Sequence, residues 1–275
     1  MIKKSVIYFF FFVMCYSIMI AFVPNKGIGT HQWQENQIRA QRFLYEMSSD
    51  TVIVGTSLSA RILLDSLNGV SSCAFSAGVV EDGLRLILSK DVIPHFVLIE
   101  TNYILRSSNE ELIKVNTQGP MPYLRNCFPI LREQNAPICL IGRCFMMGAL
   151  APAETVDMDR LHKNIKNRII EDNTHFLIEK QMEERMQTIM FLVSKLEERG
   201  AKIVLFEMPL NDKLKPVRSN EQTRQAVIHM FPKDKYIYLP NDTSTYLTND
   251  GEHLDAEGQR RYSHFLKEAL ASISF

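Results

Sequence analysis

The feature that most constrains the fold is an alternation of short apolar runs with amphipathic runs, which begins at Thr51. The brief apolar runs predict strands over residues 51–54, 72–75, 95–100, 202–208 and 236–239. The runs whose apolar residues recur every three or four positions predict helices over residues 58–67, 79–88, 174–199, 220–230 and 255–271. Alternation of this kind indicates an α/β fold in which helices cover both faces of a parallel sheet.

Residues 103–172 interrupt the alternation. They hold only brief apolar stretches, separated by Pro120, Pro122, Pro129, Pro137 and Pro152. We interpret them as an insertion over the carboxyl edge of the sheet, where a lid would shape a substrate site. The expected domain therefore covers residues 51–275, as a three-layer flavodoxin-like sandwich with about five parallel strands.

The N-terminus carries the strongest shift in composition, because residues 6–23 are apolar and uncharged. A helix of this length, at about 1.5 Å per residue, measures about 27 Å, close to the thickness of a bilayer core. We interpret residues 1–23 as an uncleaved signal anchor, since the run is long for a signal peptide and no small-x-small site follows it. A cleaved signal peptide is the alternative.

The charges around this segment predict its orientation. Lys3 and Lys4 precede it, so the positive-inside rule keeps the N-terminus in the cytoplasm and exports the chain after Pro24. We therefore expect a membrane-anchored protein with its catalytic domain on the extracytoplasmic side, periplasmic or at the cell surface. Residues 24–50 would form a membrane-proximal linker that leads to a short helix.

Charge and cysteine content exclude some classes of function. The chain of 275 residues balances 31 basic against 31 acidic side chains, so nothing predicts nucleic-acid binding. We expect Cys73 to be a buried free thiol, whereas Cys139 is expected to form a disulfide with Cys144 or Cys127 in an exported domain. No histidine or second cysteine pair is spaced to complete four ligands, so no metal or other cofactor is predicted.

The first chemical motif is the run TVIVGTS at residues 51–57. It places Ser57 at the carboxyl end of a buried strand, where open α/β sheets bind their ligands. The expected helix 58–67 would direct its positive N-terminal end toward an anion formed at Ser57. A serine that only caps this helix is the simpler alternative.

The second motif is Asp250-Gly251-Glu252-His253, in a loop before the last expected helix. Its spacing lets the Asp250 carboxylate reach Nδ1 of His253, which fixes the tautomer and leaves Nε2 free to accept a proton. This is the base that a nucleophilic serine needs. An α/β-hydrolase is disfavoured, because Ser59 stands where its nucleophile elbow requires glycine and because acid and base are only three residues apart.

These motifs, taken in order, resemble the conserved blocks of the SGNH or GDSL-type hydrolases. The resemblance covers most of residues 51–270 and is carried by Gly55-Thr56-Ser57, by Asp250-Gly251-Glu252-His253-Leu254 and by Gly258. It implies that Ser57 attacks an acyl carbonyl, that His253 acts as base and then acid, and that Asp250 orients His253. It further implies that the oxyanion donors are the Ser57 N–H, the Gly78 N–H and the Asn102 side chain.

The sequence departs from the family pattern at four positions. Thr56, Ser76, Glu100 and Tyr103 stand where Asp, Asn, Gly and Asp are common. These departures bear on the oxyanion donors more than on the Ser57, His253 and Asp250 set.

The anchor and Thr56 together resemble the exported acyltransferase branch of this superfamily. That resemblance implies an O-acyltransferase, expected to be O-acetyl, that moves an acyl group through Ser57 to a cell-surface polysaccharide. A membrane-bound O-acyltransferase would be its partner. Two alternatives stay open: an extracytoplasmic esterase that removes acyl groups from carbohydrates or lipids, and a catalytically inactive scaffold that binds polysaccharide for an export complex.

Overall fold

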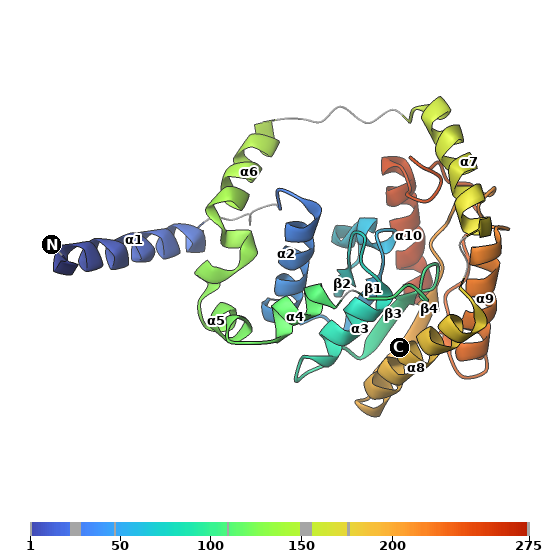
Figure 1. The fold of residues 1–275 in the computed structure, drawn as a ribbon, viewed down its shortest axis with the longest axis horizontal. Helices are drawn as coiled ribbons and strands as arrows, with labels where there is room; N and C mark the ends of the chain where they lie inside the picture. Colours follow the sequence, from blue (N-terminus) through green and yellow to red (C-terminus); the bar gives the residue numbers. More distant parts are fainter. Residues whose placement is uncertain are drawn as a thin grey trace. The chain divides into compact units, whose positions relative to one another are not determined.

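The computed structural model describes residues 2–22, 29–46, 48–108, 110–148, 156–174 and 177–273 (Figure 1). The chain forms two compact units. The first, here called the helical unit, comprises Met1–Glu46 and Glu111–Pro152. The second, here called the sheet unit, comprises Met47–Glu110 and Ala153–Phe275.

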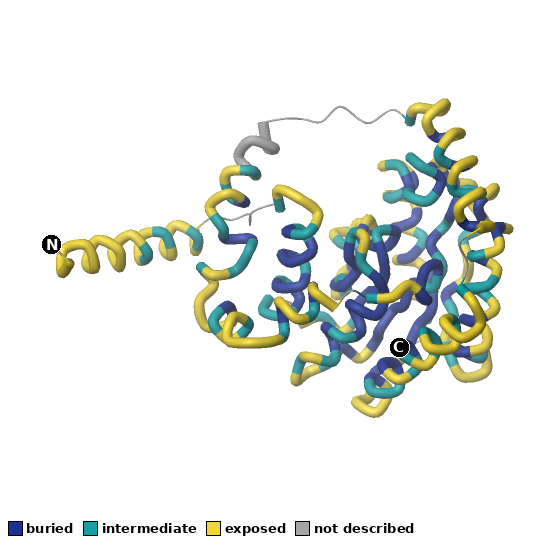
Figure 2. Tube along the Cα trace, in the orientation of Figure 1, coloured by how far each residue is buried: buried dark blue, intermediate teal, exposed yellow. Residues whose placement is uncertain are grey.

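The sheet unit is built on five parallel strands in the order β2-β1-β3-β4-β5. The strands are β1 (Thr51–Gly55), β2 (Val70–Ala74), β3 (Phe96–Glu100), β4 (Lys202–Phe206) and β5 (Ile237–Tyr238). Every residue of β3 is buried, which explains its continuous apolar run, and Figure 2 shows the strands of the sheet mostly as buried. The predicted α/β class and the five parallel strands are confirmed.

Helices cover both faces of this sheet. The helices of the sheet unit are α3 (Val80–Leu88), α7 (Met158–Thr174), α8 (Glu179–Glu198), α9 (Arg218–Met230) and α10 (Ala256–Ser272). Ile53 belongs to the same buried cluster as Leu266 of α10, whereas a Cβ atom on Gly83 of α3 would come within 2.4 Å of Val54 Cγ1. Because successive side chains of a strand point to opposite faces, α10 and α3 lie on opposite sides of the sheet, and the fold has three layers.

The predicted end of one helix at residue 199 and the predicted start of the last helix at residue 255 are confirmed. Asp255 caps α10, with its side chain accepting a hydrogen bond from the Gly258 N–H at 2.8 Å. At the end of α8, Gly200 has φ +92, and the N–H groups of Gly200 and Ala201 bond to Glu197 O and Leu196 O. This is the Schellman arrangement, which favours glycine at its left-handed position.

The helix predicted over residues 58–67 is wrong. The chain instead makes two 3-10 turns, Ser59–Arg61 and Leu64–Ser66, with extended backbone at Ile62 between them. The Leu63 N–H donates to the side chain of Ser263 at 2.9 Å instead of continuing a helix ladder. The positive end of a helix is therefore not available at Ser57, although Leu58 and Ile62 are buried in the core as their spacing predicted.

The long helix predicted over residues 174–199 is present as α8, but it begins at Glu179, five residues later than predicted, whereas Thr174 is the last residue of α7. The segment 103–172, predicted as one insertion, is divided between the two units. Residues 111–152 belong to the helical unit, whereas α7 belongs to the sheet unit.

The helical unit contains α1 (Ile2–Phe22), α2 (Gln32–Tyr45), α4 (Glu111–Thr117), α5 (Met121–Cys127) and α6 (Pro137–Gly148). By length and composition, α1 is able to cross a membrane. Within the segment predicted as a linker, α2 buries Ile38 and Phe43 and contacts α4.

The cysteine predictions have mixed outcomes. Cys73 is a buried free thiol, as predicted. Cys127 and Cys139 are also free, so the predicted disulfide of Cys139 is wrong. The side chain of Cys144 lies outside the described residues.

Candidate active site

The site forms where the carboxyl ends of β1 and β3 meet at one edge of the sheet. The register pairs Val54 of β1 with Ile99 of β3, so the residues that follow, Gly55 and Glu100, end the two strands together. Ser57 lies two residues beyond the end of β1 and is half-buried. This edge is where open α/β sheets place their ligands.

Ser57, His253 and Asp250 form a continuous chain of hydrogen bonds. His253 Nε2 lies 2.9 Å from Ser57 Oγ, and His253 Nδ1 lies 2.7 Å from Asp250 Oδ2. Three predicted residues, separated by about two hundred positions in the sequence, are thus brought together. With the Nδ1 proton held by Asp250, the free nitrogen Nε2 can accept the hydroxyl proton of Ser57.

The loop that carries Asp250 and His253 is fixed by its own backbone. The second oxygen of Asp250, Oδ1, accepts the N–H groups of Glu252 at 3.0 Å and His253 at 2.8 Å. Burial raises the pKa of Asp250, but the hydrogen bonds from the ring and backbone of His253 outweigh that effect and hold this pKa well below its ordinary value. Asp250 is therefore ionised and able to stabilise a protonated His253.

The loop turns at Gly251, which has φ +101. A Cβ atom there would come within 2.9 Å of Ile165 Cγ1 on α7 and 3.0 Å of Leu214 Cδ1. Glycine is therefore required both by the left-handed backbone and by close packing. Through this contact α7 supports the loop directly.

The loop that carries Ser57 is held by the buried carboxylate of Glu100. Glu100 is fully buried, and its Oε2 accepts the N–H groups of Thr56 at 2.9 Å and Ser59 at 3.1 Å. Its Oε1 accepts the Thr56 hydroxyl at 2.7 Å. A buried carboxylate is costly unless it is fully hydrogen-bonded, and these three donors on either side of Ser57 satisfy it.

Gly55 makes this contact possible. A Cβ atom at Gly55 would lie 2.5 Å from Glu100 Oε2 and 2.8 Å from Glu100 Cβ. The glycine of the Gly55-Thr56-Ser57 motif therefore leaves the space in which Glu100 reaches the loop.

The three donors implied for an oxyanion differ in their surroundings. The Ser57 N–H has no hydrogen-bond partner among the described residues. The Gly78 N–H donates to Phe75 O at 3.0 Å. The Asn102 side chain is buried and pairs with the backbone of Met208, donating to Met208 O at 2.9 Å and accepting Met208 N–H at 2.7 Å. Asn102 thus keeps one amide hydrogen for a ligand, whereas Gly78 would have to release Phe75.

A second network joins the loop of Asp250 and His253 to α7 through Glu252. The Glu252 carboxylate accepts a hydrogen bond from the Tyr103 hydroxyl and pairs with the Arg168 guanidinium at 2.9 Å. Burial, followed by the charge and hydrogen bond of Glu252, raises the pKa of Tyr103, so that its hydroxyl stays protonated as a donor. Arg168 also lies 3.2 Å from Asp172. Glu252 is therefore tied to the loop after β3 and to α7.

A cleft of about 820 Å³ borders this network. It opens between the loops after β2 and β3 and the helices α7, α8 and α9, and its lining includes Ala77, Tyr103, Arg106, Arg168, Arg185 and Gln222. This volume falls within the range of roughly 300–1,000 Å³ that small-ligand sites occupy. Because Tyr103 and Arg168 also hold Glu252, the cleft adjoins the loop of Asp250 and His253.

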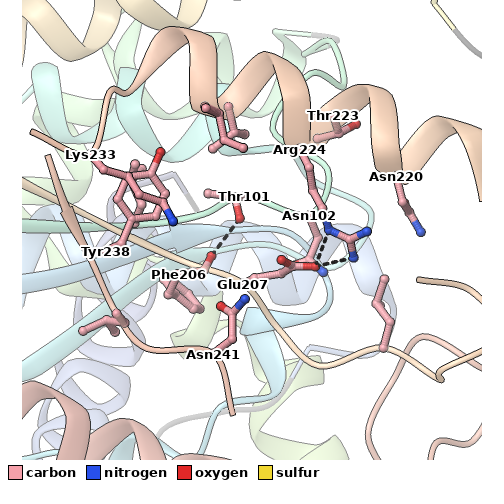
Figure 3. Close-up of a pocket in the computed structure, with 15 residues that line it drawn as sticks. Thr101, Asn102, Phe206, Glu207, Asn220, Thr223, Arg224, Lys233, Tyr238 and Asn241 are labelled. Carbon is pink, nitrogen blue, oxygen red and sulfur yellow. Dashed lines mark hydrogen bonds and ion pairs between the residues drawn. The ribbon is translucent and has the colours of Figure 1, made fainter. Parts of the chain in front are cut away.

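A smaller pocket of about 170 Å³ lies between β4, β5 and α9 (Figure 3). Its polar groups are largely paired, since Arg224 binds Glu207 at 2.8 Å and the Thr101 hydroxyl donates to Phe206 O. The remaining lining is mainly apolar, and Asn102 borders it. An apolar cavity of about 150 Å³ accommodates a benzene-sized group.

Among the described residues, no three His, Cys, Asp or Glu side chains lie close enough together to hold a metal ion.

No protein-family model and no curated protein sequence matches the chain. Among solved structures, it is similar to a GDSL-like lipase from Bacteroides thetaiotaomicron VPI-5482, with 12% identity, 87% of this chain and 98% of that chain covered, and a TM-score of 0.43. It is also similar to a protein assigned as an acylhydrolase from Bacteroides fragilis NCTC 9343, with 11% identity. The match covers 86% of this chain and 93% of that chain, with a TM-score of 0.42. At these values the functional inference rests on the site residues themselves.

Sequence reasoning missed two supports of the site. Glu100 was recognised only as a departure from a family glycine, although its position at the end of a buried strand marks it as an unusual charge. Arg168 gave no signal, because it lies in the segment interpreted as a lid.

We expect Glu100→Ala to reduce both stability and turnover, because it leaves the buried N–H groups of Thr56 and Ser59 without acceptors. Unfolding free energy should fall by about 2–4 kcal/mol, and kcat should fall by about 10- to 100-fold as Ser57 shifts. Glu100→Gln is the matched control, because its amide oxygen can still accept both N–H groups. Urea unfolding and ester turnover measure the two effects. Equal activity of the Ala and Gln variants would contradict this role.

We expect Arg168→Met to lower kcat while the KM for a small ester changes little, because Glu252 then keeps Tyr103 but loses the charged partner that helps to fix the loop of Asp250 and His253. A double-mutant cycle with Glu252→Gln should give a coupling energy in kcat of about 1–3 kcal/mol. Arg160→Met, on the exposed start of the same helix, is the control and should match the wild type. Additive effects of the two substitutions would show that the pair does not position the loop.

Proposed function

We propose that the protein is a serine-dependent acyl-transfer enzyme that works through an acyl-Ser57 intermediate. One observation supports it most: the hydrogen bonds that join Ser57 Oγ to His253 Nε2 at 2.9 Å and His253 Nδ1 to Asp250 at 2.7 Å. A hydroxyl, a base and an ionised orienting group in this order are the requirements for activating a serine.

In the proposed first step, Ser57 Oγ attacks an ester carbonyl while its proton passes to His253 Nε2. The bond to the alcohol breaks, and His253 returns the proton to the leaving oxygen, so that an acyl-Ser57 ester remains. An acceptor hydroxyl then repeats the sequence in reverse and takes the acyl group. The free Ser57 N–H and the second amide hydrogen of Asn102 are the donors best placed in the described structure to bind the oxyanion.

The acceptor decides between the two enzymatic functions. We favour transfer, expected to be O-acetyl, to a hydroxyl of a cell-surface polysaccharide, because the cleft beside the catalytic loop is large and lined by Arg, Gln and Tyr side chains. Such a lining suits a hydroxyl-rich acceptor. Hydrolysis by water, the esterase function, needs no change in the Ser57 site.

The anchor belongs to the same proposal. With α1 in the membrane and Lys3 and Lys4 on the cytoplasmic side, the sheet unit is extracytoplasmic. A membrane-bound O-acyltransferase would supply the acyl group as a partner.

The decisive experiment incubates the purified full chain with an acetyl ester donor and a polysaccharide acceptor, and analyses both by mass spectrometry. Acetyl groups on the sugar would support transfer, and release of acetate alone would support the esterase. If neither product forms, the inactive scaffold is supported.

We expect Ser57→Ala and His253→Ala each to abolish turnover without unfolding the protein, and Asp250→Asn to lower kcat by about 10⁴-fold. Ser272→Ala, an exposed serine at the end of α10 and outside the cleft lining, is the control and should retain turnover. Full activity of Ser57→Ala would refute the proposal.

A further inference from the structure

Residues 119–142 of the helical unit expose apolar side chains. Over this segment the exposed large side chains are all apolar or aromatic: Met121, Tyr123, Phe128, Leu131, Ile138 and Ile141. None of its charged residues is exposed. Large apolar side chains exposed together in one segment favour an interaction site.

The charged residues of the same segment are turned inward. Arg125, with a side chain only 8% exposed, lies 3.6 Å from Glu133 and donates to Val115 O at 3.2 Å. Arg132, 11% exposed, pairs with Glu46 at 3.0 Å. Charges are rarely buried without such partners, so the fold satisfies them inside while it exposes apolar side chains.

The interior around these arginines is also rich in amides. Buried Gln41 donates to Asn116 at 3.2 Å and accepts the Glu133 N–H at 2.8 Å. Gln134 and Asn135 are buried as well. The interior of the helical unit therefore holds these charged and amide groups beside the buried Ile38 and Phe43, while residues 119–142 expose their large apolar side chains.

The apolar helix α1 contacts the same segment. The Tyr16 hydroxyl donates to Asn135 O at 2.7 Å, and a cavity is lined by Ser17 and Ile20 of α1 together with Phe128. At about 1.5 Å per residue, Tyr16 lies about 9 Å before the end of α1 at Phe22. When α1 spans a bilayer, the segment that contacts Tyr16 is therefore below the outer end of the span.

The segment that contains helix α6 has few charged residues, as a segment at the membrane interface requires. Residues 136–153 hold one charged residue, Arg143, yet α6 has only 12 residues, about 18 Å at the α-helical rise. That length is too short to cross a hydrocarbon core of about 30 Å and is typical of an interfacial or re-entrant segment.

We propose that the surface of residues 119–142 is a lipid-binding platform, which sits in the outer interface of the membrane beside α1. Figure 2 shows α1 and much of the chain from α5 into α6 as exposed, so lipid has access to both. Burial of apolar side chains about 5–10 Å into the interface is characteristic of such segments. The protein is thus held by a span and by a second surface, independently of its activity at Ser57.

Depth-dependent fluorescence quenching of the full chain in lipid nanodiscs tests this platform. The single tryptophan, Trp33, is first replaced by Trp33→Phe, and single reporters are introduced as Phe128→Trp and Ile138→Trp. The matched control is Phe191→Trp on α8, since Phe191 is 60% exposed and Phe128 is 54% exposed. Phe10→Trp, in α1, reports whether the anchor itself is inserted.

With lipids brominated near the head of the acyl chain, we expect quenching at positions 128 and 138 to be at least threefold greater than at position 191. Equal, weak quenching at all three positions, with position 10 quenched by deep bromines, would overturn the platform and leave the anchor intact. A blue-shifted emission at 128 without bromine quenching would also overturn it, and would indicate a protein partner or a second copy instead of lipid.

Discussion

The hydrogen bonds of the buried Glu100 carboxylate are the constraint on which the site depends. They join the end of β3 to the N–H groups of Thr56 and Ser59 on either side of Ser57, and Gly55 provides the necessary space. Because β1 and β3 are neighbours in the sheet, the carboxylate fixes the loop of Ser57 against the central strand of the sheet. His253 can then meet a hydroxyl whose position is already set.

The base side of the site is fixed by a different group of contacts. Asp250 holds both the ring and the backbone of His253, while Glu252 connects the same loop to Tyr103 and Arg168. Gly251 packs against Ile165 of the same helix as Arg168. Helix α7 therefore has two roles: it supports the catalytic loop, and it forms one wall of the cleft in which we propose that the acceptor binds.

Local sequence patterns were sufficient where local physics decides the structure. The apolar runs predicted the five strands, and Asp255 and Gly200 predicted helix ends, because capping depends on a few neighbouring residues. The three-residue spacing of Asp250 and His253 likewise predicted their contact. The helix predicted over residues 58–67 does not form, because tertiary contacts, among them that of Leu63 with Ser263, override the helical spacing of the apolar residues. Arg168 and Glu252 could not be paired from sequence, since 84 positions separate them and no periodicity links them.

The helical unit shows a related limit of sequence patterns. Its prolines and brief apolar runs suggested a lid, whereas the fold buries Arg125 and Arg132 and exposes Phe128 and Ile138. Polarity along the chain does not reveal which side chains point inward. Helix α1 belongs to the same unit. In our proposals, the helical unit attaches the protein to the membrane and the sheet unit carries out the acyl transfer.

The most direct test of the central claim is covalent labelling with a fluorophosphonate, followed by peptide mapping. A Ser57 hydroxyl activated by His253 should form a phosphonyl ester at Ser57, at a rate that falls at least about 10³-fold in His253→Ala. Other half-buried serines, such as Ser66, should remain unlabelled. If Ser57 reacts no faster than Ser66, or if the rate is the same without His253, then Ser57 is not an activated nucleophile.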